Sequence, residues 1–464
     1  MRNKIRVLGW TLGLAVWLSV GCAGLSSLHA ETSQPLPPLK KSPQQPQLLV
    51  LSPQTKPPAL PSSLNLLMHA QFQPSILRRR PEIKEENGRT RPLFLPLPAI
   101  ASNPNKGVDF GILPVVLFFD KENSGRIKNI LAPSLIFNTE TGLKGAFRWL
   151  GYLPKGAKYQ LIAIQSIDVD SDYIAEIEAP RIGPNDRFAA ATGVRFERDP
   201  TKVFYGFGPD SRKGGKSGLI QRQYLASLSA GINFLEHFRV SYNERLRVAL
   251  IEDGGGSQDP FIGDTFPGAS GVRTWSTISA RGLSVLFDTR DSGATPTRGY
   301  FGMVGVEISQ QALGSEQSFT RVYGEAKAFF PWPNTQWISA VRVFSSFIDN
   351  GGVPHYEQSV LGGKDFRGFP SGRFVDRGVF TVNLEERIRV IRLELLRVPF
   401  DVEAAPFVEF GQVFNDLADI EARRLQVSYG LGIRAVVRPD VVAKIDIGVA
   451  DEGINVRVGL DYPF

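Results

Sequence analysis

Residues 454–464, INVRVGLDYPF, alternate strictly between two kinds of side chain. One set, spaced two apart, consists of Ile454, Val456, Val458, Leu460, Tyr462 and Phe464. The other set consists of Asn455, Arg457, Gly459, Asp461 and Pro463. A period of two predicts a β-strand with one face in an apolar medium and the other face in a polar medium.

The same alternation recurs upstream, for example in residues 380–390 and 444–449. In a soluble sandwich such apolar faces pack against each other, whereas in an outer-membrane barrel they face lipid and the polar faces line the lumen. The strands are about ten residues long, the length that a tilted strand needs to span a bilayer. Connections also alternate between short ones, such as 154–155, and long ones, such as 252–271 and 351–372. These features favour the barrel.

We therefore predict an all-β protein, a transmembrane antiparallel β-barrel over residues 107–464. About sixteen strands are expected from Asn129 onward, because each strand and its loop take roughly 21 residues. Residues 110–119, FGILPVVLFF, are either an additional strand or a segment that enters the barrel from the periplasm.

Composition excludes several classes of function. The chain has 464 residues and a net charge of +7, but its Lys and Arg residues are scattered singly, which argues against a nucleic-acid partner. One cysteine, Cys22, excludes disulfide frameworks and cysteine-based metal sites. The histidines His29, His69, His237 and His355 lack the spacing of metal ligands. We therefore expect no metal and no cofactor.

Residues 1–30 have the features of a bacterial export signal. Arg2, Lys4 and Arg6 precede an apolar stretch over residues 7–20, which is typical of a secretory signal peptide. Cleavage after Ala30 is favoured. The alternative is lipoprotein processing at Cys22, because residues 18–22 (LSVGC) resemble a lipoprotein signal.

Residues 31–106 are rich in proline, as in PLPPLKKSPQQPQ and RPLFLPLPAI. Proline fixes φ and removes a backbone donor, so this segment is expected to form neither sheet nor stable helix. We interpret it as an extended, largely disordered periplasmic arm. It is either a plain linker or a tether to a periplasmic partner.

Four further motifs lie in or beside the predicted strands. They are FYGFGPDS (204–211), DTRDSGATPTRGYF (288–301), LGGKDFRGFP (361–370) and RVGLDYPF (457–464). In this order and spacing they resemble the Omp85 superfamily, specifically the bacterial surface-antigen barrel domain of outer-membrane assembly proteins. The resemblance covers roughly residues 107–464.

The resemblance implies a sixteen-stranded barrel whose sixth extracellular loop folds back into the lumen. Arg367, Gly368 and Phe369 match the family's loop motif, although Phe366 stands where the family has Val or Ile. In the family this arginine contacts acidic residues on inward strand faces, and the candidates here are Glu385 and Glu409. The family usually has Asp at the position of Glu409.

The resemblance also implies how the barrel is made and placed. The terminal strand, with Gly459, Tyr462 and Phe464, is similar to the sorting signal that the barrel-assembly machinery reads. The expected location is the bacterial outer membrane, with membrane lipid as a partner and a monomeric barrel.

The function that this implies is non-enzymatic. A BamA- or TamA-like role is expected in assembly, insertion or translocation of outer-membrane protein or lipid. The alternative is a passive or gated pore for small solutes. The proline density of residues 31–104 argues against a POTRA domain there, which weakens the inference to assembly. No catalytic residue is predicted, because His237 and His355 have no adjacent Ser or Asp motif.

Overall fold

The computed structural model describes residues 92–103, 105, 107–119, 127–253, 259–267, 271–333, 335–395, 398–437 and 441–460. The predicted signal peptide, most of the proline-rich arm, Tyr462 and Phe464 lie outside these residues. All described residues belong to one compact unit, Pro53–Phe464.

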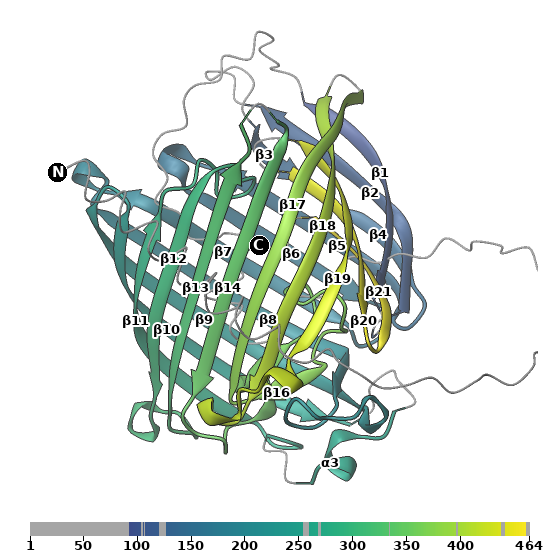
Figure 1. Ribbon diagram of the computed structural model, residues 1–464, viewed down its shortest axis with the longest axis vertical. Coiled ribbons are helices and arrows are strands. Elements are labelled where there is room, and N and C mark those ends of the chain that lie inside the picture. The colour runs from purple at the N-terminus through teal and green to yellow at the C-terminus, as the bar shows by residue number, and fades with distance from the viewer. Residues whose placement is uncertain are drawn as a thin grey trace, which may run out of the picture. The chain divides into compact units, whose positions relative to one another are not determined.

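The described chain is all-β, and its strands form a barrel (Figure 1). One antiparallel sheet contains 19 strands. They are β1 (Leu93–Asn103), β2 (Gly107–Phe119), β3 (Ile127–Leu131), β4 (Ser134–Asn138), β5 (Gly142–Tyr152), β6 (Lys158–Ser166), β7 (Ser171–Ile182), β8 (Phe188–Phe204), β9 (Ser217–Leu235), β10 (Phe238–Glu252), β11 (Ser276–Asp288), β12 (Gly299–Ser309), β13 (Phe319–Pro331), β14 (Trp337–Ile348), β17 (Gly378–Leu395), β18 (Val398–Phe414), β19 (Gln426–Val437), β20 (Val441–Ala450) and β21 (Gly453–Leu460).

The remaining elements lie in the connections. A separate two-stranded sheet pairs β15 (Ser359–Leu361) with β16 (Phe374–Asp376). A short α-helix, α3 (Ile262–Thr265), lies between β10 and β11. Single turns of 3₁₀ helix are η1 (Pro154–Gly156), η2 (Pro184–Asp186), η3 (Lys213–Gly215), η4 (Gln311–Leu313), η5 (His355–Glu357), η6 (Leu417–Asp419) and η7 (Ala422–Arg424). Among the described residues, no helix has the length and apolar character to cross a membrane.

The strands follow one another around the barrel as a meander, and β1 lies beside β21 (Figure 1). Without β1 and β2 the sheet has 17 strands, and of these β3 and β4 share one place between β2 and β5. Sixteen places therefore run from β3 and β4 to β21, and the β1–β2 hairpin adds two more. Residues 110–119 are thus part of a strand of the sheet.

Strand β1 corrects the predicted boundary of the proline-rich arm. Leu93–Asn103 pairs with β2 along its whole length, although the sequence suggested that residues up to 106 could not form sheet. The register places Pro96 opposite Pro114. Directly opposed residues of an antiparallel ladder alternate between hydrogen-bonded and non-hydrogen-bonded pairs. Two opposed prolines fit a non-hydrogen-bonded pair, so neither removes a donor from this ladder.

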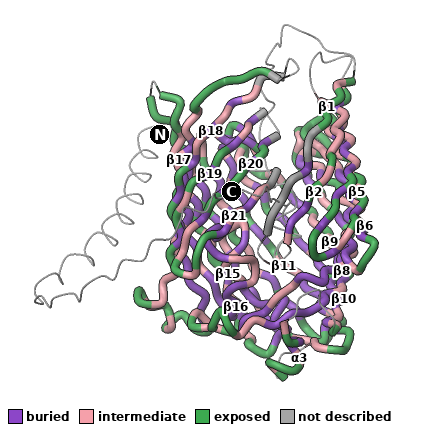
Figure 2. Tube along the Cα trace, turned by 90° about the vertical axis from the view of Figure 1, so that its right-hand side faces the viewer, coloured by how far each residue is buried: buried purple, intermediate pink, exposed green. Residues whose placement is uncertain are grey.

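The alternating pattern separates an apolar outer face from a polar inner face. On β10, Leu246 is 43% exposed, whereas its neighbours Arg245 and Arg247 are 1% and 0% exposed. The buried side chains inside the barrel include many arginines and carboxylates, and Figure 2 shows the buried residues concentrated around β15 and β16. This arrangement is the reverse of a soluble sandwich, whose apolar faces meet each other.

Candidate functional site

The candidate site is loop 6, residues 349–377, which connects β14 to β17 and contains η5, β15 and β16. The β15–β16 hairpin carries the tip, with Leu361 paired to Phe374. Gly362 and Gly363 have φ values of +116° and +90°, a region that favours glycine, and they turn the chain into the tip. Phe366 and Phe369 are fully buried and stack with their ring centroids 5.5 Å apart. The tip is therefore packed inside the barrel.

Arg367 lies at the centre of the tip and contacts three wall carboxylates. Its guanidinium donates to Glu385 at 2.6 Å and to Glu409 at 2.7 Å, and a longer bond reaches Asp446 at 3.3 Å. We call Arg367 with these three carboxylates the tip cluster. The carboxylates come from β17, β18 and β20, so one side chain bridges several strands. A planar guanidinium fork suits this task.

Further contacts fix the tip in position. The guanidinium carbon of Arg367 lies 3.4 Å from the ring centroid of Phe407. The backbone N–H of Arg367 donates to Glu409 at 2.5 Å. The N–H of Gly368 donates to Ser428 at 2.8 Å. Asn455 and Arg457 of β21 donate to the carbonyl oxygens of Arg367 and Phe369. The tip therefore contacts strands from β17 to β21.

One glycine on the wall and one glycine in the tip allow the two to approach closely. A Cβ atom on Gly448 of β20 would lie 2.6 Å from the carbonyl oxygen of Arg367. A Cβ atom on Gly368 would lie 2.5 Å from the hydroxyl of Ser428. Both distances are too short for van der Waals contact, so the close approach of loop and wall depends on the missing side chains.

A second group of charges surrounds the base of loop 6. Glu357 in η5 is fully buried and accepts from Arg245 at 3.0 Å and from Arg321 at 2.9 Å. Arg247 lies 3.0 Å from the same carboxylate and also donates to the carbonyl of Tyr356. We call Glu357 with these three arginines the base cluster. Glu307 of β12 accepts from Arg245 and Arg321 and offsets part of their charge.

The two clusters act on the ionisation of the loop residues at their centres. Burial by itself lowers the pKa of Arg367, but Glu409, Glu385 and Asp446 together raise it above its usual value. Burial by itself raises the pKa of Glu357, but Arg245, Arg247 and Arg321 hold it well below its usual range. Both loop residues are therefore charged at neutral pH, and each is neutralised by the wall.

The turn between β11 and β12 approaches the tip cluster from the other end of the barrel. In this DTRD turn Asp288 accepts from Arg290 at 2.9 Å, and both side chains are buried. Arg387 donates to Glu385 at 3.0 Å and reaches the carbonyl of Pro296 at 3.5 Å. Glu385 is thus linked both to loop 6 and to this turn.

The positions singled out by the sequence divide into three groups. Arg367, Gly368, Phe369, Glu385 and Glu409 lie together around the tip. Gly459 lies in β21, opposite Lys444 of β20. Tyr462 and Phe464 lie outside the described residues.

No motif in the sequence assigns a role to Asp446, Phe407 or the base cluster. A signal for the base cluster exists in hindsight. The segment RLR at 245–247 places two arginines on the inward face of one strand, and a carboxylate stands at 357 in the loop. Within the described residues, no group of His, Cys, Asp or Glu is arranged to hold a metal ion.

A family model of the Omp85 superfamily domain matches residues 184–437, which include β8 to β19 and the whole of loop 6. The chain belongs to the Omp85 superfamily. It is therefore an outer-membrane β-barrel protein of the Omp85 type. No curated protein sequence gives a significant match.

Several solved structures resemble this Omp85 chain. BamA from Haemophilus ducreyi lacking POTRA domains 1–3 aligns over 81% of this chain and 75% of that chain, with 12% identity and a TM-score of 0.50. CdiB from Acinetobacter baumannii aligns over 72% and 59%, with 13% identity and a TM-score of 0.45. CdiB from Escherichia coli aligns over 69% and 59%, with 10% identity and a TM-score of 0.48. At 12% identity, the likeness to BamA concerns the fold alone.

Proposed function

We propose that this protein inserts, assembles or translocates protein or lipid at the bacterial outer membrane, and that loop 6 is the plug of its barrel. Membership of the Omp85 superfamily supports the first part. The observation that carries the second part is the position of the loop, whose tip and base are both buried and both neutralised by wall charges. The proposed role is non-enzymatic.

We extend the proposal to both ends of the sequence, most of which lie outside the described residues. We propose that residues 1–30 direct export and that the proline-rich arm up to residue 91 lies in the periplasm, as a linker or as a tether to a partner. Gly459, Tyr462 and Phe464 are proposed to form the sorting signal for the barrel-assembly machinery. The barrel itself is proposed to act as a monomer.

A reconstitution assay tests the assembly role. Liposomes that contain the purified protein are mixed with a urea-denatured outer-membrane barrel, and the rate at which that client folds is followed by its heat-modifiable migration on a gel. The proposal expects folding several-fold faster than in empty liposomes. An equal rate in both kinds of liposome contradicts it.

A pore for small solutes is the second candidate, and one observation favours it. Part of the inner wall carries charged side chains that pair within the wall, such as Arg195 with Asp172 and Glu197. Such a wall is compatible with water and ions. Single-channel recording separates the candidates. A plugged barrel gives a small, fluctuating conductance that rises when residues 351–375 are replaced by a short Gly–Ser linker. A pore gives a steady, large conductance in the unaltered protein.

A further inference from the structure

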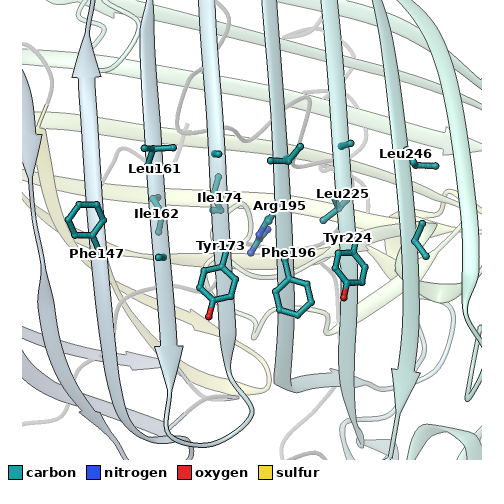
Figure 3. A pocket seen from close by; sticks show the side chains of 15 residues that line it. Phe147, Leu161, Ile162, Tyr173, Ile174, Arg195, Phe196, Tyr224, Leu225 and Leu246 are labelled. Carbon is teal, nitrogen blue, oxygen red and sulfur yellow. The ribbon is translucent and has the colours of Figure 1, made fainter.

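An aromatic row crosses the outer face of three neighbouring strands. The rings of Tyr173, Phe196 and Tyr224 lie side by side on β7, β8 and β9, with centroids 5.9 Å and 4.9 Å apart (Figure 3). Trp275 continues the row at 6.0 Å from Tyr224. Tyr and Trp are enriched where a membrane protein meets the boundary between hydrocarbon and headgroups. The row therefore marks that boundary at the end of the barrel that carries loop 6.

The outer surface is hollowed next to this row, on the side of the row that lies toward the middle of the strands. The hollow has a volume of about 550 Å³ and lies over β5 to β10 (Figure 3). The register places Ala175, Val194 and Ala226 next to one another across three strands, and the two alanines have small side chains. Larger side chains such as Leu161 and Leu246 stand at its margins. The small alanines between larger side chains leave a gap wide enough for an acyl chain.

On the other side of the row, two arginines are direct neighbours. Arg198 of β8 lies opposite Arg222 of β9, one step beyond the pair Phe196 and Tyr224. Like charges directly opposite each other destabilise a sheet. Glu252 contacts both guanidiniums, at 3.1 Å and 2.9 Å, but one carboxylate leaves one positive charge in excess. The Nε of Arg198 is buried and makes no hydrogen bond.

Charge, aromatic row and apolar hollow follow one another along the same strands in the order of a lipid's own parts. We propose that this wall binds a phosphate-bearing outer-membrane lipid whose headgroup has a net negative charge. Its phosphate lies against Arg198 and Arg222, and one acyl chain lies in the hollow. Successive outward residues of a strand are about 7 Å apart, so the arginines and the hollow lie within the reach of one lipid molecule. The site is on the outside of the barrel and does not depend on the proposed role of loop 6.

Native mass spectrometry of the full-length protein in detergent tests the headgroup contact. Phosphatidylglycerol is compared with phosphatidylcholine carrying the same acyl chains. We expect the unaltered protein to retain phosphatidylglycerol preferentially. The double variant Arg198→Gln/Arg222→Gln is expected to lose about tenfold in retention, the effect of one lost charge-assisted hydrogen bond. Undiminished retention overturns the proposal. So does displacement of the lipid by 10 mM inorganic phosphate, since the site then binds free anions.

A matched pair of variants tests the acyl-chain contact. Ala226→Phe fills the hollow, and Ala230→Phe makes the same change on the outward face of the same strand, four residues away and outside the hollow. We expect Ala226→Phe to lose the bound lipid and Ala230→Phe to keep it. Equal retention by the two variants overturns the assignment of the hollow. Heat-modifiable migration verifies that each variant is folded before it is measured.

Discussion

The two ends of loop 6 are held by clusters of opposite polarity. At the tip, the loop supplies a cation and the wall supplies carboxylates from β17, β18 and β20. At the base, the loop supplies a carboxylate and the wall supplies arginines from β10 and β13. If the two ends of the loop exchanged places, Arg367 would meet arginines and Glu357 would meet carboxylates. The opposite polarity of the clusters therefore specifies one position for the loop. These charges therefore select one position of the loop more than they add stability.

Reversing one charge should break this scheme most severely. Arg367→Glu places a fourth carboxylate among Glu385, Glu409 and Asp446. We expect the tip to leave the wall at a cost of about 5 kcal/mol, the upper range for a broken buried pair. The conductance of single channels should then rise toward that of the loop deletion.

The control for this variant is Arg423→Glu, which makes the same change of charge at a side chain that is 74% exposed. Its conductance should equal that of the unaltered protein. If Arg367→Glu also leaves the conductance unchanged, the tip cluster does not hold the loop.

Replacing the charged loop residue of one cluster by an uncharged residue should lower the stability of the protein by a smaller amount. Glu357→Gln leaves Arg247 beside no carboxylate, and Arg367→Met leaves Glu409 without its cation. Each should lower the free energy of unfolding by about 3 kcal/mol. The measurement is urea unfolding in lipid vesicles.

The double variant Glu357→Gln/Arg367→Met shows whether the two clusters hold the loop independently. Since they lie on different strands and share no partner, the two losses should add to within about 0.5 kcal/mol. A coupling energy well above this value contradicts the view that the two ends are held independently.

Filling the space that the tip occupies beside β20 should cause the next largest loss of stability. Gly448→Ala places a methyl group 2.6 Å from the carbonyl of Arg367 and should cost about 2 kcal/mol by overpacking. Gly145→Ala on β5 is the matched control, because its Cβ would meet nothing within 4 Å. Equal urea midpoints for the two variants would show that the tip does not approach β20 this closely.

The smallest effect that we expect is a pH dependence of the free energy of unfolding, caused by His355 at the base of loop 6. Burial, with a contribution from Arg247, lowers the pKa of His355 to about 4. The unfolded chain has a histidine pKa near 6.5 and therefore binds protons first as the pH falls, so the folded protein loses stability below that value. Between pH 7 and pH 6 the loss is about 0.7 kcal/mol. His355→Phe should remove this part of the pH dependence; an unchanged slope in urea unfolding contradicts it.

The sequence predicted the strands well because alternation is a local property of the chain. It did not predict β1, since the effect of Pro96 depends on the residue opposite it, and the register places Pro114 there. Arg367, Glu385 and Glu409 were identifiable through a motif. The base cluster was not, because Glu357 meets Arg245 and Arg321 only through the placement of three distant segments, which no local pattern contains.

The position of the loop tip can be tested most directly by a double-mutant cycle on the pair of Arg367 and Glu409. Arg367→Met, Glu409→Gln and the double variant are compared with the unaltered protein by urea unfolding in lipid vesicles. Because the guanidinium of Arg367 lies 2.7 Å from the Glu409 carboxylate, the sum of the two single losses should exceed the loss in the double variant by about 2 kcal/mol. A coupling energy near zero is the contradicting result, because the tip of loop 6 then lies away from β18.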